Sequence, residues 1–324
     1  MKAVVYTQYG SPDVLQLKEV AKPTPKDNEI LIKIRATSVT AVDSTFRKGD
    51  DFSARLFTGI MKPKNPTLGS YFAGEVEAVG KDVTRFKVGE QLFGPTEIDF
   101  GAHAEYITLS EEAAVVKKPS NVSYQEVAAL GEALTALPFL RDTGKIKRGD
   151  KILINGASGA IGSIAVQLAK YYGAEVTGVC STANLELVKS LGADAVVDYT
   201  KEDFAKKGQT YDIIFDTVGK RSFSDCKKAL KPNGRYLTTV LSLAILPQML
   251  WTSKVGSKKA LFSATGLRSA SEKQKDLHLL SELIEAGTLK PVIDKSYPLA
   301  QIAEAHSHVD KGHKKGSVVV EIAI

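Results

Sequence analysis

The sequence predicts an α/β protein in which a doubly wound parallel sheet is joined to a second, mostly-β domain. Short alternations of apolar and polar residues, separated by Gly, Pro and Asp, fill the chain up to about residue 120. From Tyr124 onward, longer helical periods alternate with compact apolar strands, a pattern typical of βαβ units with parallel strands. A glycine-rich turn at 156–162 lies between such a strand and such a helix.

The composition excludes several other classes of protein. The 324 residues are 43% hydrophobic and 25% charged, which suits a globular chain of two domains and not a disordered or fibrous one. The net charge of +6 is spread along the chain, and its short basic runs lack interleaved aromatic residues, so nucleic acid is not favoured as a partner. Two cysteines cannot build a disulfide framework, and no apolar stretch is long enough for a membrane span, so we expect a cytoplasmic protein with reduced thiols.

The individual elements follow in chain order. In the first part, alternation with a period of two predicts strands at 30–35, 74–79, 90–93 and 104–109. In the second part, apolar runs predict five strands, at 151–155, 175–179, 195–198, 212–216 and 235–240. Helical periods predict helices at 161–172, 184–191 and 272–286. A last strand at 317–322 is similar in character to the first part, so we expect the chain to return there.

The strongest local signal is the glycine-rich turn between the strand at 151–155 and the following helix. Backbone N–H groups at a helix N-terminus, together with the helix dipole, bind anions. A glycine at 159 lets the backbone approach a pyrophosphate, and a glycine at 162 lets the helix pack closely on the strand. The motif predicts a Rossmann-type dinucleotide site, with a tight turn that binds nothing as the alternative. Its residues are Gly156, Ala157, Ser158, Gly159, Ala160, Ile161 and Gly162.

The end of the next strand bears on which dinucleotide is bound. Sites that prefer NAD usually place an acidic residue there, where it binds the ribose 2′-hydroxyl. Here Cys180, Ser181 and Thr182 follow the strand, and hydroxyl groups can donate to a 2′-phosphate. We therefore expect NADPH as the cofactor. Cys180 itself is expected to be a small, buried, apolar residue at a strand end.

Seven segments carry a family resemblance across the chain: MKAVVY at 1–6, GSPDV at 10–14, IRATSVT at 34–40, AGEVEAVG at 73–80, FKVGEQLFG at 86–94, LTA at 134–136 and the turn at 156–162. With these segments the chain resembles the zinc-independent medium-chain dehydrogenases/reductases of the quinone oxidoreductase type. The resemblance implies a GroES-like domain over 1–123, completed by 267–324, and a Rossmann NADP-binding domain over 124–266, with a cleft between them. It also implies a homodimer in which the edge left by the last Rossmann strand pairs across two chains.

The departures from the zinc-dependent relatives predict that this chain has no metal site. Those relatives carry a cysteine where this chain has Thr40, a His-Glu pair where it has Ser70 and Tyr71, and a four-cysteine lobe that is absent here. Catalytic zinc needs three protein ligands. The five histidines do not replace them, because His103 and His278 are isolated and His306 and His308 would point about 200° apart on a helix. We expect ordinary surface or capping histidines.

The resemblance also implies roles for single residues. Thr40 and Asp43 would lie on the loop that faces the nicotinamide, and Tyr71, where relatives commonly carry Asp, could bind a substrate oxygen. For Tyr71, packing against the domain interface is the alternative. Further residues are implied to contact the cofactor or re-enter the cleft: Thr135, Ser181, Tyr199, Val218, Gly219, Val240, Leu241, Gly316 and Ser317. Leu185 stands where relatives often have a lysine, which weakens the case for NADPH unless Lys220 or Arg221 supplies the charge.

The residues that are missing favour a particular chemistry. Without zinc ligands, and with no Tyr-x-x-x-Lys pair at any of its 11 tyrosines, the chain lacks the usual means of stabilising an alkoxide. A quinone or α,β-unsaturated carbonyl delocalises the incoming charge itself, so positioning in a dry cleft is sufficient. We predict an NADPH-dependent, metal-free reductase of quinones or α,β-unsaturated carbonyls. The alternatives are a zinc-free NADP-dependent alcohol dehydrogenase, and a dinucleotide-binding protein that senses redox state or binds RNA with little turnover.

Overall fold

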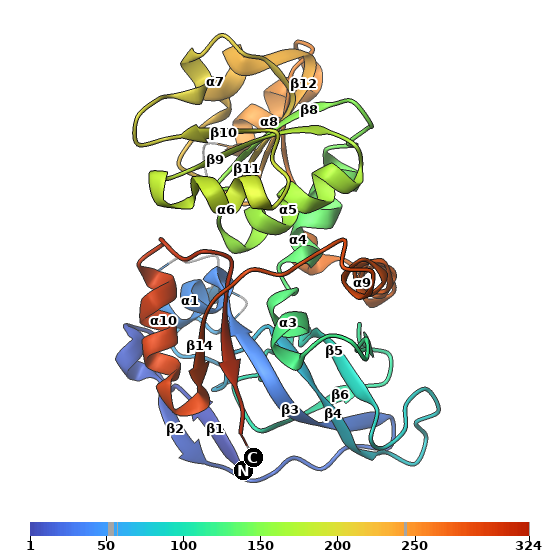
Figure 1. The fold of residues 1–324 in the computed structure, drawn as a ribbon. Coiled ribbons are helices and arrows are strands. Elements are labelled where there is room, and N and C mark those ends of the chain that lie inside the picture. Colours follow the sequence, from blue (N-terminus) through green and yellow to red (C-terminus); the bar gives the residue numbers. More distant parts are fainter. Residues whose placement is uncertain (51–54, 57, 243–244, 324) are drawn as a thin grey trace. The chain divides into compact units, whose positions relative to one another are not determined.

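The computed structural model describes residues 1–50, 55–56, 58–242 and 245–323, and it divides the chain into two compact units (Figure 1). Unit 1 consists of Met1–Gly131, Ser269–Glu285 and Pro291–Ile324. Unit 2 consists of Glu132–Arg268 and Ala286–Lys290. Within the described ranges, no helix is both long enough and apolar enough to cross a membrane.

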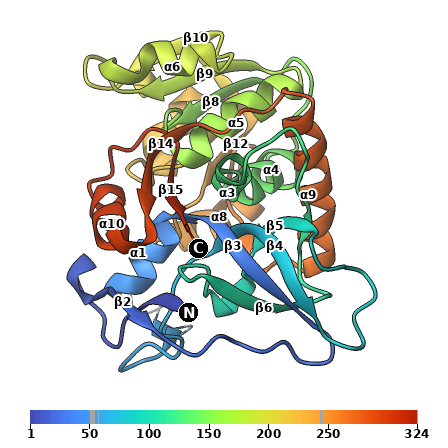
Figure 2. The ribbon, with the colours of Figure 1, turned by 60° about the horizontal axis from the view of Figure 1, so that its bottom comes forward.

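Unit 1 is built around the long strand β3 (Glu29–Val39). Its alternating sequence buries Ile30, Ile32 and Ile34 completely in the core of this unit. The first half of β3 pairs with β6, and its second half pairs with the C-terminal strand β15, which Figure 2 shows beside it. The sheet order is β14-β15-β3-β4-β5-β7, with β6 attached to β3. The other strands of unit 1 are β1 (Lys2–Val5), β2 (Gln16–Glu19), β4 (Tyr71–Val79), β5 (Gln91–Pro95), β6 (Tyr106–Ser110), β7 (Val116–Lys117), β14 (Ile293–Pro298) and β15 (Ser317–Glu321).

The helices of unit 1 are short except for one. They are α1 (Ala41–Lys48), α3 (Tyr124–Ala129), α9 (Ala270–Glu285) and α10 (Ile302–Asp310), with 3₁₀ turns at Pro12–Val14, Glu97–Asp99 and Leu299–Gln301. The helix α1 begins at a capping box, because the Thr40 hydroxyl accepts from the Asp43 N–H and the Asp43 carboxylate accepts from the Thr40 N–H. It ends at Gly49, whose φ of 62° is left-handed.

Unit 2 holds a six-stranded, fully parallel sheet in the order β10-β9-β8-β11-β12-β13. The strands are β8 (Lys151–Asn155), β9 (Glu175–Cys180), β10 (Ala195–Asp198), β11 (Tyr211–Asp216), β12 (Leu230–Thr238) and β13 (Lys259–Phe262). The helices are α4 (Ala133–Pro138), α5 (Ala160–Tyr171), α6 (Leu185–Ser190), α7 (Phe223–Cys226) and α8 (Ile245–Lys254). Short helical turns occupy Phe139–Thr143, Thr182–Asn184, Phe204–Lys206, Lys227–Ala229 and Thr265–Leu267. The predicted fold class, a doubly wound parallel sheet with a mostly-β partner, is confirmed.

One strand of this sheet was not predicted. β13 lies beyond β12, so the strand predicted at 235–240 is an interior strand and not the edge. That strand, β12, ends at Thr238, two residues earlier than predicted. β13 was missed because its four residues, Lys259–Phe262, are too few for an alternation with a period of two to be recognised.

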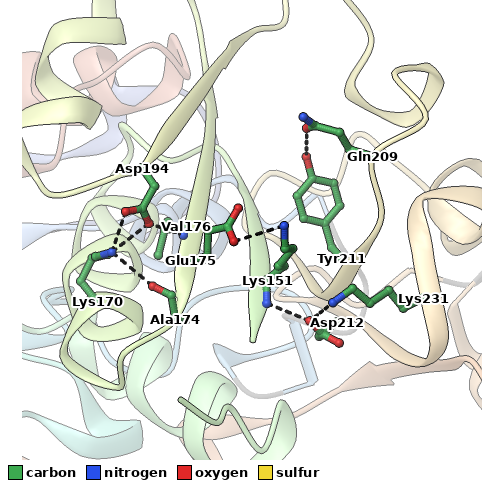
Figure 3. A network of polar contacts seen from close by, with 10 residues as sticks. All are labelled: Lys151, Lys170, Ala174, Glu175, Val176, Asp194, Gln209, Tyr211, Asp212 and Lys231. Atoms are coloured by element: carbon green, nitrogen blue, oxygen red, sulfur yellow. Dashed lines mark hydrogen bonds and ion pairs between the residues drawn. The ribbon is translucent and has the colours of Figure 1, made fainter. Parts of the chain in front are cut away.

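The amino ends of the unit 2 strands are tied together by charged side chains (Figure 3). The Asp212 carboxylate accepts from the Lys151 N–H at 2.8 Å and from Lys231 Nζ at 2.7 Å. Lys151 Nζ lies 3.2 Å from a Glu175 carboxylate oxygen, and Lys170 Nζ donates to Asp194 at 2.8 Å. These pairs are partly exposed, so each contributes little to stability. A ligand crevice is expected at the opposite end of the sheet, because doubly wound folds bind their ligands at the carboxyl ends of the strands.

Candidate active site

The carboxyl ends of β8 and β11 form the topological switch point of the parallel sheet. From β8 the chain adds β9 and β10 on one side, and then returns to place β11 on the other side of β8. The loops that follow β8 and β11 therefore lead away in opposite directions and leave a crevice between them, where dinucleotides bind in doubly wound folds. The predicted glycine turn follows β8 directly.

Each of the three glycines of this turn is required for a different structural reason. Gly156 has a φ of 82°, which a residue with a side chain adopts only with strain. A Cβ on Gly162 would lie 2.1 Å from the carbonyl oxygen of Gly156, so only glycine lets α5 approach the turn this closely. Gly159 is the N-cap of α5 and leaves the first helical N–H groups without a capping side chain. A pyrophosphate fits this arrangement, because it would accept from those N–H groups at the positive end of the helix dipole.

A buried carboxylate shapes the other side of the crevice. Asp216 ends β11 and is fully buried. Its Oδ1 accepts from Asn155 Nδ2 at 2.9 Å and from the N–H groups of Val218 and Gly219 at 3.0 and 3.1 Å. Its Oδ2 accepts from the Tyr236 hydroxyl at 3.0 Å. Burial, together with the charge of Asp216, raises the pKa of Tyr236 well above its usual value. Asp216 therefore fixes the loop that carries two predicted cofactor contacts.

The loops after β11 and β12 contact each other at the crevice. A Cβ on Gly219 would lie 2.6 Å from Val240 Cγ2, so the Val240 side chain packs directly on this glycine. Val218, Val240 and Leu241 are 42%, 42% and 51% exposed, which is high for apolar side chains. Apolar side chains exposed at the mouth of a crevice suit contact with a flat ligand ring. Thr135 lies on α4 in the same unit and is partly exposed.

The ends of β9 and β10 form the side of the crevice where an adenosine would lie. Ser181 follows β9 and is partly exposed, and its Oγ accepts weakly from Asn184 Nδ2 at 3.3 Å. The same amide donates to Ser158 Oγ of the glycine turn at 3.0 Å. Asn184 thus joins two predicted cofactor residues. Tyr199 is 53% exposed and donates its N–H to the Cys180 carbonyl.

An acidic residue does lie in this region, one strand over from the position considered in the sequence. Asp198 ends β10 and accepts from the hydroxyls of Thr182 and Thr200 at 2.5 and 2.7 Å. These hydrogen bonds lower the pKa of Asp198 to about 2. The Thr182 hydroxyl is therefore directed at Asp198, which leaves Ser181 as the hydroxyl open to a phosphate. Arg221 donates to Asp203 at 3.0 Å, so its charge is partly neutralised.

In unit 1, Asp43 acts as a buried anchor for the loop that begins α1. Its Oδ2 accepts from the Thr40 N–H at 2.8 Å and from the Thr40 hydroxyl at 2.7 Å. Its Oδ1 accepts from the Ser70 hydroxyl at 2.8 Å and the Gly69 N–H at 3.2 Å. Asp43 is completely buried, so it holds Thr40 against the segment just before Tyr71.

Tyr71 packs against a glycine of the same unit. A Cβ on Gly131 would lie 2.3 to 2.7 Å from three ring carbons of Tyr71, so the ring rests on the bare backbone of Gly131. The Tyr71 carbonyl accepts from the Thr37 hydroxyl at 2.6 Å. Ser317 belongs to the same neighbourhood of unit 1, since its hydroxyl donates to the Ala129 carbonyl at 3.0 Å. The preceding Gly316 has a φ of 67° and fits closely against Val292.

The expectation of surface or capping histidines is wrong for two of the five. His103 and His306 are both completely buried, and their ring centroids are 5.5 Å apart in an edge-to-face arrangement. The sequence gives no sign of this contact, because His103 lies shortly before β6 whereas His306 lies on α10, near the other end of the chain. Over the ranges that the structure describes, no group of three or more His, Cys, Asp or Glu side chains is placed to hold a metal ion.

The predicted site residues thus form two groups, one in each unit. Unit 2 gathers the glycine turn, Ser181, Val218, Gly219 and Val240 around one sheet end. Unit 1 gathers Thr40 and Asp43 directly, and places Tyr71 beside Gly131. Sequence reasoning missed Asn155, Asp216 and Gly131. The first two could have been found as polar residues that end neighbouring apolar strands, whereas nothing in the sequence links Gly131 with Tyr71.

This fold and this glycine turn define a dinucleotide-binding protein of the doubly wound α/β class. Two family models match the chain: the alcohol dehydrogenase GroES-like domain over residues 26–120, and the zinc-binding dehydrogenase domain over residues 191–320. The chain belongs to the medium-chain dehydrogenase/reductase family, in its quinone oxidoreductase branch.

Several known proteins are similar over nearly the whole chain. The 2-methylene-furan-3-one reductase of Solanum lycopersicum is 36% identical over 99% of this chain and 79% of that protein. The chloroplastic NADPH-dependent alkenal/one oxidoreductase of Arabidopsis thaliana is 33% identical over the same shares. The structure of the quinone oxidoreductase from Coxiella burnetii is 28% identical, with a TM-score of 0.89 over 100% of this chain and 99% of that chain.

Proposed function

We propose that this protein reduces quinones or α,β-unsaturated carbonyls with NADPH and without a metal ion. The observation that carries the proposal is the glycine turn at the switch point of the parallel sheet, in a chain of this family. Bound there, the reduced nicotinamide would supply the hydride. The relatives named as quinone and alkenal/one oxidoreductases support this acceptor class.

The residues of unit 1 would orient the acceptor. The Tyr71 hydroxyl would donate to a carbonyl oxygen, while Asp43 accepts the proton of the Thr40 hydroxyl and so holds the Thr40 loop in place. A conjugated acceptor spreads the added charge over its own atoms, so one or two neutral donors suffice. The polar side chains around Thr40 are hydroxyls and one carboxylate, so they do not supply the three protein ligands that catalytic zinc needs. This supports a metal-free reaction.

NADPH is proposed over NADH on the geometry at the end of β9. No carboxylate ends that strand, and Ser181 lies there with Asn184 beside it. The nearby Asp198 has its oxygens occupied by Thr182 and Thr200. The relative from Arabidopsis thaliana, named as NADPH-dependent, supports the same choice.

A cytoplasmic homodimer is proposed as the assembly. β13 is one edge of the unit 2 sheet, and α8, which contacts it, exposes Leu250 and Trp251 to 70% and 66%. A second copy that pairs along β13 would cover the open edge.

One experiment tests the function: initial rates of NADPH and NADH oxidation with quinones, enones and simple ketones, with and without a metal chelator. We expect quinones or enones to be reduced, NADPH to be preferred and the chelator to change nothing. Reduction of simple ketones would instead support the alcohol dehydrogenase alternative. Tight NADPH binding with no acceptor turned over would support a redox sensor.

The same panel tests the role of Tyr71. In Tyr71→Phe, loss of a hydrogen bond worth about 1 kcal/mol in the transition state should lower kcat/KM for enones about fivefold. Tyr171→Phe is the control, because Tyr171 is a half-exposed residue at the end of α5. Equal kinetics of Tyr71→Phe and wild type would remove Tyr71 from the reaction.

A further inference from the structure

A buried asparagine, Asn184, lies between the two segments of unit 2 that carry the predicted phosphate contacts. It ends the short helical turn that follows β9 and is only 8% exposed. The turn brings Asn184 back to Ser181, because the Asn184 N–H donates to the Ser181 carbonyl at 2.9 Å. A buried polar side chain normally has hydrogen-bond partners, so the partners of this amide indicate what it does.

Asn184 does not use its side chain for the local purpose that asparagine often serves. It is the N-cap of α6, where the side-chain oxygen of an asparagine normally accepts a backbone N–H of the first helical turn. Here no such cap bond is present, and Oδ1 is buried without a partner among the described residues. A buried acceptor without a partner costs free energy. The hydrogen bonds of this side chain are therefore made by its NH₂ group alone.

Both partners of the NH₂ group are serine hydroxyls. Nδ2 of Asn184 donates to Ser158 Oγ at 3.0 Å and, more weakly, to Ser181 Oγ at 3.3 Å. The segments that carry these serines are also joined through the backbone, because the Ala157 N–H donates to the Val179 carbonyl of β9 at 2.9 Å. Asn184 thus adds a side-chain link between the glycine turn and the end of β9.

The direction of these hydrogen bonds leaves each serine with a proton to donate. A serine hydroxyl has one proton and two lone pairs, and donation from Nδ2 uses a lone pair. Neither hydroxyl proton has an acceptor among the described residues. The Asp198 carboxylate at the end of β10 accepts from Thr182 and Thr200 instead. Two hydroxyl protons are therefore available to an anionic ligand, and ionised phosphate oxygens are strong acceptors.

We propose that Asn184 is a positioning residue for the dinucleotide: by donating to Ser158 and Ser181, it directs the proton of Ser158 to the pyrophosphate and that of Ser181 to the 2′-phosphate. This role rests on the proposed function, because only NADPH carries the 2′-phosphate. The Ser158 contact serves NADH and NADPH alike, whereas the Ser181 contact serves NADPH alone. Asn184 therefore supports the choice of cofactor without touching it.

The opposite orientation of the amide would have the opposite effect. If Oδ1 faced the serines, it would accept both hydroxyl protons and leave none for a phosphate. Removal of the amide would then release the protons and tighten the binding of NADPH. In the arrangement described above, removal of the amide frees each hydroxyl to rotate away from the phosphate, so binding weakens. The sign of the change therefore tests the direction of the hydrogen bonds.

The test is isothermal titration calorimetry of wild type and Asn184→Leu with NADPH and with NADH, which needs no turnover. Leucine is similar in size to asparagine but has no polar side-chain atom. We expect the Kd to rise about tenfold for NADPH and about threefold for NADH, because the first loses two oriented donors and the second loses one. Asn184→Ala should change the ratio of the two Kd values in the same direction, so the result does not depend on how leucine fits.

Two backgrounds separate the two serines. If Asn184 acts through Ser181, then in Ser181→Ala the change Asn184→Leu should affect NADPH and NADH by the same factor. If it also acts through Ser158, then in Ser158→Ala the same change should leave the Kd of NADH unaltered. A general loosening of the fold would lower both affinities equally in every background. A selective loss of NADPH that persists in Ser181→Ala would overturn the proposed role.

Asn121→Leu is the matched control, because Asn121 is an exposed asparagine of unit 1 whose Nδ2 donates to the Glu285 carbonyl. It should keep both Kd values of wild type. An unchanged ratio in Asn184→Leu, or tighter binding of NADPH, would overturn the inference even where wild type prefers NADPH. A wild type that binds NADPH no more tightly than NADH would overturn the proposed cofactor and the Ser181 contact, while the NADH titrations would still decide the Ser158 contact. A wild type that binds neither would overturn both proposals.

Discussion

Two glycines of the glycine turn serve different ends: Gly162 is required for the fold, and Gly159 for binding the cofactor. A Cβ on Gly162 would meet the Gly156 carbonyl oxygen at 2.1 Å and the Ala157 Cα at 2.9 Å, and these are backbone atoms that cannot turn aside. A Cβ on Gly159 would have one neighbour, the same oxygen at 3.3 Å, and the φ of Gly159 is −77°. The two positions look alike in the motif but differ in the structure.

We predict that Gly162→Ala destabilises the protein by about 1–3 kcal/mol, because α5 must move away from the turn. Gly159→Ala should keep a stability near that of wild type without cofactor, yet bind NADPH at least tenfold more weakly, because its methyl group would occupy the approach of the pyrophosphate. Urea unfolding and fluorescence titration with NADPH measure the two effects. Equal loss of stability in both variants would contradict the distinction.

Some residues of the site could be predicted and others could not, for a physical reason. The glycine turn is a local signal, since a strand, a turn and a helix N-terminus follow one another within 20 residues. The role of Asp216 is not local, because its partners Asn155 and Tyr236 are 61 and 20 residues away. The contact of His103 with His306 likewise joins segments some 200 residues apart, as their numbers show.

Helices and strands were likewise predictable where their sequence pattern is local and long enough, and not where they depend on contacts between distant segments. The strand predicted at 151–155 matches β8, because its three consecutive apolar residues form a clear pattern in the sequence. β13 has only four residues and was missed. At the junction of α3 and α4, the sequence contains Gly131 without any sign that an aromatic ring from β4 rests on it. Contacts between elements depend on packing that a one-dimensional pattern does not contain.

The junction of α3 and α4 gives a prediction at this scale. Gly131→Ala should destabilise the protein by about 1–3 kcal/mol, because its methyl group would lie within 2.7 Å of the Tyr71 ring carbons. In the double variant with Tyr71→Ala, the clash disappears. The double variant should therefore lose less stability than the sum of the two single losses, by at least about 1 kcal/mol.

Gly266→Ala is the control for this pair, since a Cβ on Gly266 would meet nothing within 4 Å. Its free energy of unfolding should stay within about 0.5 kcal/mol of wild type. Urea unfolding of wild type and the four variants provides the comparison. Strict additivity of Gly131→Ala and Tyr71→Ala would mean that the ring does not rest on Gly131.

For the whole molecule, buried titratable groups set the pH range of stability. Burial lowers the pKa of His103 and His306. Below a pH of about 6.5 the unfolded chain therefore binds protons at these histidines that the folded protein does not bind. The free energy of unfolding must therefore fall as the pH drops below that value. Burial also raises the pKa of Cys180 to about 11 and of Cys226 to about 12. Unfolded thiols ionise near pH ~8.5, so stability must also fall as the pH rises above it.

We predict a broad maximum of stability between pH ~6.5 and ~8.5, with losses of order 1 kcal/mol per pH unit and per group on either side. Urea midpoints at pH 5.0, 7.5 and 10.0 measure this profile. Cys226→Ala should reduce the loss between pH 7.5 and 10.0 and leave the acid side unchanged, because a buried methyl group does not titrate. His306→Leu should do the reverse. A midpoint that stays constant from pH 5.0 to 10.0 would show that these four groups titrate in the folded protein as they do in the unfolded chain.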